Sequence, residues 1–236
     1  MEKYGYLWIS VILFIPWLLL FYYHKNLRRR MVISGLVFAP FGTLNLWFKQ
    51  DYWNAPEVYI FFSAISIDDI LFAFITTGIG VAIFDALFTE KQVKQEKSRV
   101  NILWIALMLV MISWYILREI IGINSMFMFA IPVLITTIIF IIIRKDLLIP
   151  SLITTLLTTI IAAITYIILF NYLLPKFWST YWFLWDKEYG WTVFGNVPVL
   201  ELLWYLSWGS LSAILYDFGK GTKKIPNKLW RKLTNQ

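Results

Sequence analysis

Two adjacent carboxylates, Asp68 and Asp69, stand at the start of a long apolar segment, in the sequence SAISIDDILFAF (residues 63–74). A third, Glu201, stands at the start of another apolar segment, in PVLELLWYL from Pro198. A carboxylic acid in a dry site can donate a proton to an alkene, and aromatic faces stabilise the cation that results. We therefore predict that Asp68, Asp69 and Glu201 are catalytic residues.

Aromatic side chains follow these carboxylates at helical spacing. Counted from Glu201, they occur at i+3, i+4 and i+7, so a helix places them on the same face as the carboxylate. Ordinary packing or a belt at the membrane interface is the alternative for most aromatic residues of this chain. The predicted substrate-binding residues are aromatic residues of these helix faces and one tryptophan of the loop FWSTYWFLWDKEYGW: Phe72, Trp182, Trp204, Tyr205 and Trp208.

Helix capping is the alternative role for the three carboxylates. A carboxylate in the first turn of a helix accepts free backbone N–H groups and complements the positive end of the helix dipole. Capping explains one acidic residue per helix more easily than the adjacent pair, because neighbouring like charges repel in a low dielectric. Both roles stay open at this point.

Two further aspartates, Asp85 and Asp217, lie sixteen residues beyond Asp69 and Glu201, or about 24 Å along a helix. They are too distant to share a reaction centre with those carboxylates. We expect each to form a solvated pair with a nearby lysine, Lys91 or Lys220.

The chain lacks the residues of several common sites. It has no cysteine and one histidine, so thiolate nucleophiles, disulfides and multi-histidine metal sites are excluded. No G-x-G-x-x-G or P-loop occurs, and DDILF lacks the third aspartate of the magnesium-binding DDxxD pattern. We therefore expect no metal and no cofactor.

Composition indicates an integral membrane protein. The 236 residues are 60% hydrophobic and only 15% charged, whereas soluble domains carry about 25% charged residues. The net charge of +7 comes from basic clusters between or after apolar segments. That distribution is typical of the positive-inside rule and argues against a nucleic-acid partner. The expected partner is the lipid bilayer.

Seven transmembrane helices are expected, each near the roughly 20 residues that cross a bilayer. Their approximate ranges are 4–23, 31–48, 69–89, 101–121, 124–143, 147–174 and 197–218. The basic loops HKNLRRR, EKQVKQEKSR and RKD and the basic tail 219–236 fall on one side of such a bundle. We therefore expect a cell-membrane protein with its N-terminus outside and its C-terminus in the cytoplasm.

The chain also contains an internal similarity. SIDDILFAFITTGIGVAIFDAL, from Ser66, aligns with PVLELLWYLSWGSLSAILYDFG, from Pro198, at an offset of 132. Chance similarity between apolar helices is the alternative, but carboxylates match at both ends of the alignment. We predict a single all-α membrane domain of two parallel three-helix repeats, about 4–89 and 124–218, joined by the fourth span. An axis along the membrane normal would relate them.

The two acidic motifs resemble those of membrane lycopene cyclase domains of the bacterial heterodimeric, archaeal and fungal type. These domains carry a proline-x-Glu-Glu motif that opens a helix, followed by a leucine- and phenylalanine-rich run. SIDDILFAF matches it with Asp68 and Asp69 on the glutamate positions, and PVLELLWYL matches it with Pro198 on the proline and Glu201 on the second glutamate. Serine replaces the first proline and Leu200 replaces one glutamate.

The resemblance implies a carotenoid or isoprenoid cyclase. In that reaction an end group of lycopene is protonated, closes to a ring and loses a proton, without redox change. It implies proton donation by the Asp68/Asp69 pair, with Glu201 as a second acid/base or electrostatic stabiliser and an apolar isoprenoid as substrate. The alternatives are a non-catalytic binding or accessory protein, a transporter on the same scaffold, and a hydratase that quenches the cation with water.

Overall fold

A computed structural model describes residues 4–58, 60–61, 65–94 and 96–228, and 75% of it is helical. Within this part of the chain, seven helical segments are long and apolar enough to cross a membrane. They are Gly5–Tyr23, Lys25–Asp51, Ile67–Phe88, Val100–Ile120, Ser125–Ile143, Lys145–Leu173 and Val199–Lys220. Six of them agree with the predicted spans to within two residues at each end.

The second segment differs from its predicted range and is not one continuous α-helix. It consists of η2 (Lys25–Leu27), α2 (Arg28–Phe38), the 3₁₀ segment η3 (Ala39–Leu44) and α3 (Asn45–Asp51). It begins six residues before the predicted start because the basic residues of HKNLRRR are themselves helical. The sequence APFGTL of η3, with its proline and glycine, interrupts the α-helix in the middle of the span.

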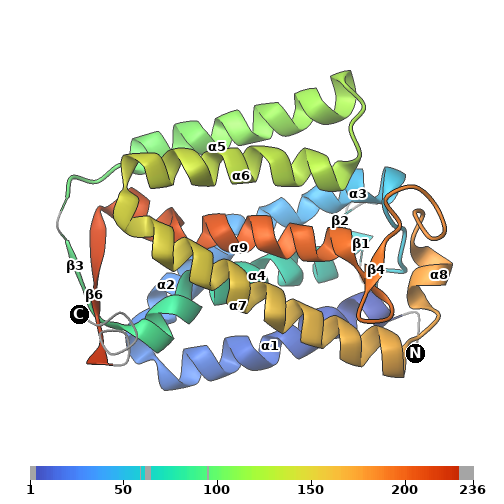
Figure 1. The fold of residues 1–236 in the computed structure, drawn as a ribbon, viewed down its shortest axis with the longest axis horizontal. Helices are drawn as coiled ribbons and strands as arrows, with labels where there is room; N and C mark the ends of the chain where they lie inside the picture. Colours follow the sequence, from blue (N-terminus) through green and yellow to red (C-terminus); the bar gives the residue numbers. More distant parts are fainter. Residues whose placement is uncertain (1–3, 59, 62–64, 95, 229–236) are drawn as a thin grey trace.

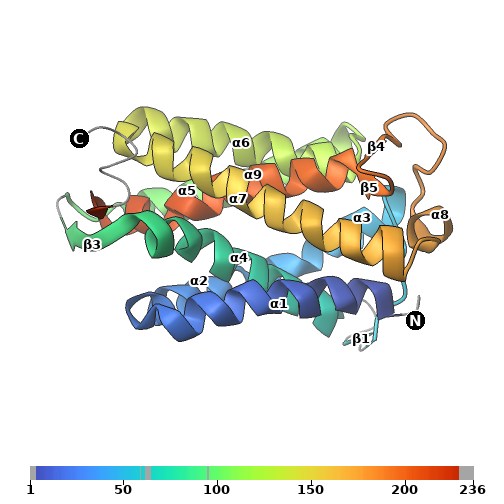
Figure 2. The same cartoon turned by 60° about the horizontal axis from the view of Figure 1, so that its bottom comes forward.

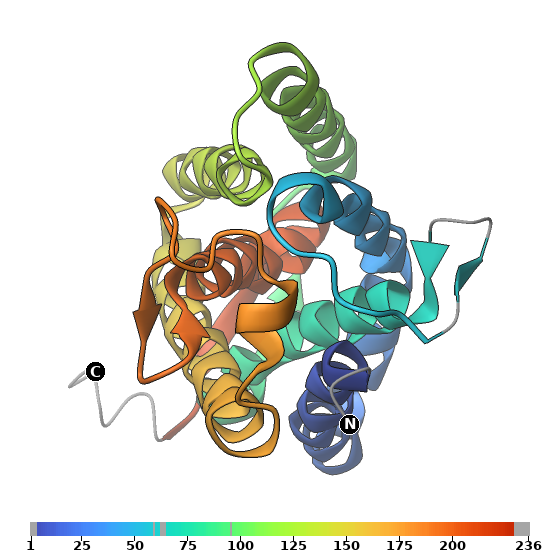
Figure 3. The same ribbon diagram turned by 90° about the vertical axis from the view of Figure 1, so that its right-hand side faces the viewer.

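Two helices form the centre of the bundle, α4 (Ile67–Phe88) and α9 (Val199–Lys220), and they pack on each other. In Figures 1 and 2, α1 (Gly5–Tyr23), α2, α6 (Ser125–Ile143) and α7 (Leu148–Ile167) surround them. The outermost helix is α5 (Val100–Tyr115), which Figure 3 shows at the edge of the bundle. The segments of α4 and α9 are 67% buried and that of α5 is 17% buried, so α4 and α9 hold the interior.

The expectation of an all-α protein is wrong in one respect, because three small antiparallel sheets connect the helices. Two precede the central helices: β1 (Ile60–Phe61) with β2 (Ile65–Ser66), and β4 (Thr192–Val193) with β5 (Val197–Pro198). The third pairs β3 (Thr89–Lys94) with β6 (Thr222–Pro226). β6 belongs to the predicted basic tail, of which residues 229–236 lie outside the described residues.

These sheets mark the two ends of the bundle in Figure 1. The first described residues, β1, β2, β4, β5 and the short helix α8 (Phe177–Tyr181) lie at one end, called here the N-terminal end. β3 and β6 lie at the opposite, C-terminal end. Both central helices therefore run from the N-terminal to the C-terminal end.

The two aspartates near the C-terminal end are not solvated, so the expected pairs with exposed lysines are wrong. Arg30 of α2 forms ion pairs with both Asp85 and Asp217, the second at 3.0 Å. Lys224 of β6 also reaches both, at 2.8 Å from Asp85 and 3.1 Å from Asp217. The two aspartate side chains are at most 1% exposed. We call Arg30, Asp85, Asp217 and Lys224 the charge quartet. Its charges balance, which makes burial of the two carboxylates tolerable.

Candidate functional site

A cavity lies toward the N-terminal end of the bundle, between the central helices and the second helical segment. About 650 Å³ of space unfilled by atoms lies within it and its opening. Most of its lining is aromatic or aliphatic, and Glu201 is the only acidic residue among the described residues that line it. The lining residues are Tyr6, Phe38, Phe41, Gly42, Leu44, Asn45, Phe48, Tyr52, Trp53, Phe72, Ala73, Met126, Phe129, Tyr166, Glu201, Trp204 and Trp208.

Glu201 is directed into the interior rather than used as a helix cap. It is the third residue of α9, whose N-terminus receives no side-chain cap, and it is only 8% exposed. Its Oε2 accepts a hydrogen bond of 2.7 Å from the hydroxyl of Tyr166, on α7. The Tyr52 side chain also lies near this carboxyl group. A tyrosine from α7 therefore holds one buried carboxyl group at the cavity wall, with a second tyrosine beside it.

Tyr52 follows α3, just beyond the end of the second membrane-crossing segment. Its side chain is 1% exposed. Burial raises the pKa of Tyr52 well above 10.0, and the nearby Glu201 raises this pKa further. Tyr52 is therefore a neutral phenol at physiological pH, and its hydroxyl can donate a hydrogen bond to the Glu201 carboxylate.

Asp69 lies at the corresponding position of α4, and its surroundings differ. It forms a capping box with Ser66: the Asp69 N–H donates to Ser66 Oγ at 3.2 Å, and the Ser66 N–H donates to Asp69 Oδ2 at 3.4 Å. Tyr6 also interacts with the Asp69 side chain. Asp69 is 1% exposed and does not line the cavity.

Asp68 is also bound to backbone rather than directed at the cavity. Its Oδ2 accepts a hydrogen bond of 2.8 Å from the backbone N–H of Val58, which fixes the connection that leads to α4. Its side chain is fully buried, and its Oδ1 has no hydrogen-bond partner among the described residues. The adjacent carboxylates of the DD pair thus serve two different stretches of backbone.

Three of the five predicted aromatic residues line the cavity: Phe72, Trp204 and Trp208. The rings of Phe72 and Trp204 are 5.1 Å apart between centroids, and Trp204 stacks on Phe129 at 5.2 Å. Several aromatic rings therefore line the same cavity as Glu201.

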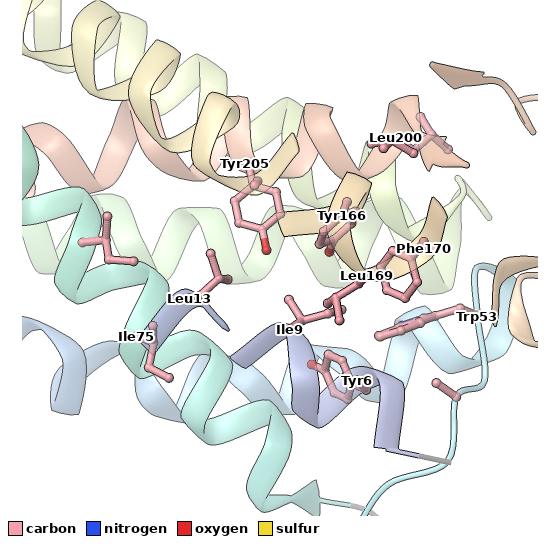
Figure 4. Packing of buried hydrophobic residues seen from close by; sticks show 14 of the residues in the cluster. Tyr6, Ile9, Leu13, Trp53, Ile75, Tyr166, Leu169, Phe170, Leu200 and Tyr205 are labelled. Carbon is pink, nitrogen blue, oxygen red and sulfur yellow. The ribbon is translucent and has the colours of Figure 1, made fainter. Parts of the chain in front are cut away.

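The other two predicted aromatic residues lie outside the lining. Tyr205 is directed at a smaller adjoining space deeper in the bundle, and Figure 4 shows its ring in the same part of the core as Tyr166. Trp182 is buried in the loop region, where it pairs with Trp53 in an isolated antiparallel bridge and contacts Tyr52 at 6.1 Å between rings.

Sequence analysis missed the polar residues that other elements bring to the cavity. Trp53 Nε1 donates to Asn45 Oδ1 at 3.0 Å, and Asn45 Nδ2 donates to Glu57 at 3.1 Å. Lys49 neutralises Glu57 in an ion pair. Tyr166 could have been noticed as a tyrosine inside a span of isoleucines, leucines and threonines. Its bond to a residue 35 positions away leaves no trace in local spacing.

No protein-family model, curated protein or solved structure matches this chain. The chemistry of the cavity must therefore be read from its own residues. One carboxyl group in an aromatic, water-poor site can deliver a proton to an apolar molecule and take one back. The surrounding π-faces can stabilise a transient carbocation.

Proposed function

We propose that this protein is a membrane-embedded carotenoid or isoprenoid cyclase in which Glu201 is the acid and base. The observation that carries the proposal is the position of Glu201, a single carboxyl group in an aromatic cavity inside an apolar helix bundle. A substrate that is almost entirely hydrocarbon partitions into the bilayer around such a site. The acidic motifs that resemble those of membrane lycopene cyclase domains point to the same reaction.

The proposed reaction is balanced without a redox partner. The carboxylic acid of Glu201 adds its proton to the terminal double bond of a polyene end group. The resulting cation is attacked by a neighbouring double bond, which forms the ring carbon–carbon bond. The ring cation then loses a proton to the Glu201 carboxylate, which regenerates the acid. Phe72 and Trp204 stabilise the cations through their faces, and Tyr166 orients the carboxyl group.

This assignment moves the acid role from the Asp68/Asp69 pair to Glu201. Asp69 is bound to Ser66 in a capping box and Asp68 to the Val58 N–H, so both carboxylates are engaged by backbone. Neither lines the cavity. Under this proposal, the pair forms and anchors the start of α4 and contributes to catalysis only through the fold.

The two-repeat architecture belongs to the same proposal. Element bounds support it: β1, β2 and α4 have the same lengths as β4, β5 and α9, and their bounds differ throughout by 132. Residues separated by 132 also meet each other along the α4/α9 interface. Phe72 contacts Trp204, and Gln92 pairs with Lys224 in the β3/β6 sheet. Such self-pairing is what an axis running between the two parallel helices would produce.

A cytoplasmic location for the C-terminal end is likewise proposed. Exposed basic residues gather on the segments of this end, in the turn after α1, in β3 and β6 and in the turn before α7. The positive-inside rule then places the N-terminus outside. Reporter tags after residue 236 and in the 183–191 loop should report opposite sides of the cell membrane.

Expression in a lycopene-accumulating bacterium tests the function. The wild-type chain should convert lycopene to cyclised pigment, and Glu201→Gln should abolish conversion because an amide cannot supply the proton. The matched variant Asp69→Asn should keep most of the conversion, because the asparagine side-chain oxygen can still accept the hydrogen bond from the Ser66 N–H. Unchanged pigment in cells with abundant wild-type protein in the membrane would refute the proposal.

A non-catalytic binding role is the second candidate, and one observation favours it. Tyr166 donates a hydrogen bond to the Glu201 carboxyl group, and a carboxyl group held in this way can bind a ligand without transferring a proton. A bound but chemically unchanged isoprenoid in the purified wild-type protein would support this role against catalysis.

A further inference from the structure

The cavity is not equally covered on all sides. Most of its lining residues are buried, and six are partly exposed. Four of these six belong to one stretch of the second helical segment, and the other two are the central aromatic pair. They are Phe41, Gly42, Leu44, Phe48, Phe72 and Trp204. The opening of the cavity therefore lies beside residues 41–48.

This stretch begins in η3, the 3₁₀ interruption in the middle of a membrane-crossing segment. Backbone that departs from the α-helix at membrane depth is tolerated where it is buried or lines a cavity. Gly42 brings η3 against the start of α4, since a side chain at this position would collide with the backbone carbonyl of Asp69. One side of the opening is thus formed by a 3₁₀ segment that packs closely against the start of α4.

The N-terminal end above the cavity is closed by two sets of bonds. Across the loops, the Asn54 N–H donates to the Tyr181 carbonyl and the Phe183 N–H to the Tyr52 carbonyl, each at 2.9 Å. Tyr52 also lines the cavity, so this loop pairing lies directly over it.

A polar clasp closes the same end beside α3. Asp51, the last residue of α3, forms an ion pair with Arg118 and accepts a hydrogen bond of 2.6 Å from the Ser125 hydroxyl. Trp47 Nε1 donates to Glu119 at 2.8 Å. These bonds join α3 to the connection between α5 and α6. Arg118 and Glu119, which are adjacent in the sequence, thus each bind a residue of α3.

The opposite end of the bundle is also closed. The charge quartet joins α2, α4, α9 and β6 there, and the β3/β6 sheet covers it. Between these two closed ends, the partly exposed stretch 41–48 faces the side of the bundle. That side is where lipid surrounds a membrane-crossing segment.

We propose that the cavity fills sideways from the bilayer through a portal at residues 41–48, and that its ligand is an uncharged, membrane-dissolved isoprenoid rather than a water-borne metabolite. The inference rests on the proposed function in taking this cavity as the substrate site. Leu44 is the side chain to change, because it lies in η3, lines the cavity and is partly exposed.

Binding kinetics of lycopene to the purified protein in lipid nanodiscs test the portal, followed by the absorbance change of the polyene. Leu44→Trp should slow both association and dissociation several-fold, because a bulkier side chain at the opening raises the barrier for entry and for exit. Leu44→Ala should speed both rates and gives a milder change to the fold. Ile105→Trp, on the exposed face of α5, is the matched control and should change neither rate.

A change in Kd through dissociation alone would make Leu44 a binding residue and overturn the portal. Unchanged rates in both Leu44 variants would overturn it as well. The outcome is separable from that of the proposed function. If the Leu44 variants change the binding rates but the wild type converts no pigment, the portal stands and the cyclase is refuted. If the wild type converts lycopene but the Leu44 variants leave the binding rates unchanged, the cyclase stands and the portal is refuted.

Discussion

The central helices carry a matched pair of carboxylates at each end, and the two pairs are used differently. Near the C-terminal end, Asp85 and Asp217 share the same two cations, Arg30 and Lys224. Near the N-terminal end, Asp69 caps its own helix and interacts with Tyr6, whereas Glu201 has no capping role and accepts a hydrogen bond from Tyr166 at the cavity wall.

The difference between the two pairs distinguishes carboxylates that stabilise the fold from a carboxylate that lines a cavity. Equal treatment of Asp85 and Asp217 is what stability requires, because both carboxylates are buried and each needs compensating charge. The unequal surroundings of Asp69 and Glu201 mean that one carboxyl group caps its own helix, whereas the other has no capping role and lines the cavity. The carboxylates at matched positions thus have the same role at the C-terminal end and different roles at the N-terminal end.

The C-terminal pair should give the largest effect on stability. Arg30→Met removes a shared cation and leaves two buried aspartates with only Lys224, which should lower the free energy of unfolding by about 3–5 kcal/mol. Thermal unfolding in detergent micelles measures this loss. Arg29→Met, at an exposed neighbouring position, is the control and should change stability by no more than about 0.5 kcal/mol. Equal, small effects of the two variants would show that the quartet is not structural.

The N-terminal pair should separate function from stability at Tyr166. Tyr166→Phe removes the hydroxyl that donates to Glu201 at 2.7 Å. Hydrogen bonds to charged groups contribute about 1.5–3 kcal/mol, so conversion of lycopene should fall about 10- to 100-fold. Tyr172→Phe, at a side chain that is 77% exposed, should keep full conversion. Normal conversion of lycopene by Tyr166→Phe would show that the Tyr166–Glu201 hydrogen bond does not contribute to the reaction.

Much of the fold could be predicted from apolar runs, because each span must satisfy its backbone within one helix and so has a fixed length. The interruption at η3 was missed, since APFGTL lies inside an apolar run that is long enough to cross the bilayer. Two of the small sheets were missed because two-residue strands have no periodicity to detect. The third was missed because its strands, TEKQVK and TKKIP, lie in basic segments that were interpreted as a loop and a tail.

The candidate site was predictable only in part. Glu201, Trp204 and Trp208 share one helix face, so their spacing alone places them together. Tyr52 and Tyr166 reach Glu201 from other elements, and no local spacing encodes that meeting. The roles of Asp69 and Glu201 also looked alike in sequence. Ser66 before one helix and Pro198 before the other decide which carboxylate has a reciprocal cap partner, because proline has no hydroxyl to complete a capping box.

Asp69 should show a smaller effect that follows cap chemistry. Asp69→Ala removes one side of the capping box and should cost about 0.5–2 kcal/mol of unfolding free energy, whereas Asp69→Asn should cost only a few tenths. Thermal unfolding of both variants in detergent measures the difference. A loss of lycopene conversion in Asp69→Asn, with normal stability, would restore the acid role to Asp69 and remove the contrast with Glu201.

The smallest effect concerns the pH dependence of stability at Tyr52, a buried tyrosine beside Glu201. Because burial and Glu201 raise the pKa of Tyr52 well above 10.0, the stability that its neutral form contributes is fully present below pH 10.0 and is lost as the pH rises through the raised value. Tyr52→Phe should therefore lower the unfolding free energy by about 0.5–1.5 kcal/mol, by the same amount at about pH 6 and about pH 9. Thermal unfolding at both values, with Tyr172→Phe as the control, measures the difference. If the difference in unfolding free energy between the wild type and Tyr52→Phe is smaller at about pH 9 than at about pH 6, Tyr52 ionises in the folded protein within this range. An ionised Tyr52 could not donate a hydrogen bond to Glu201.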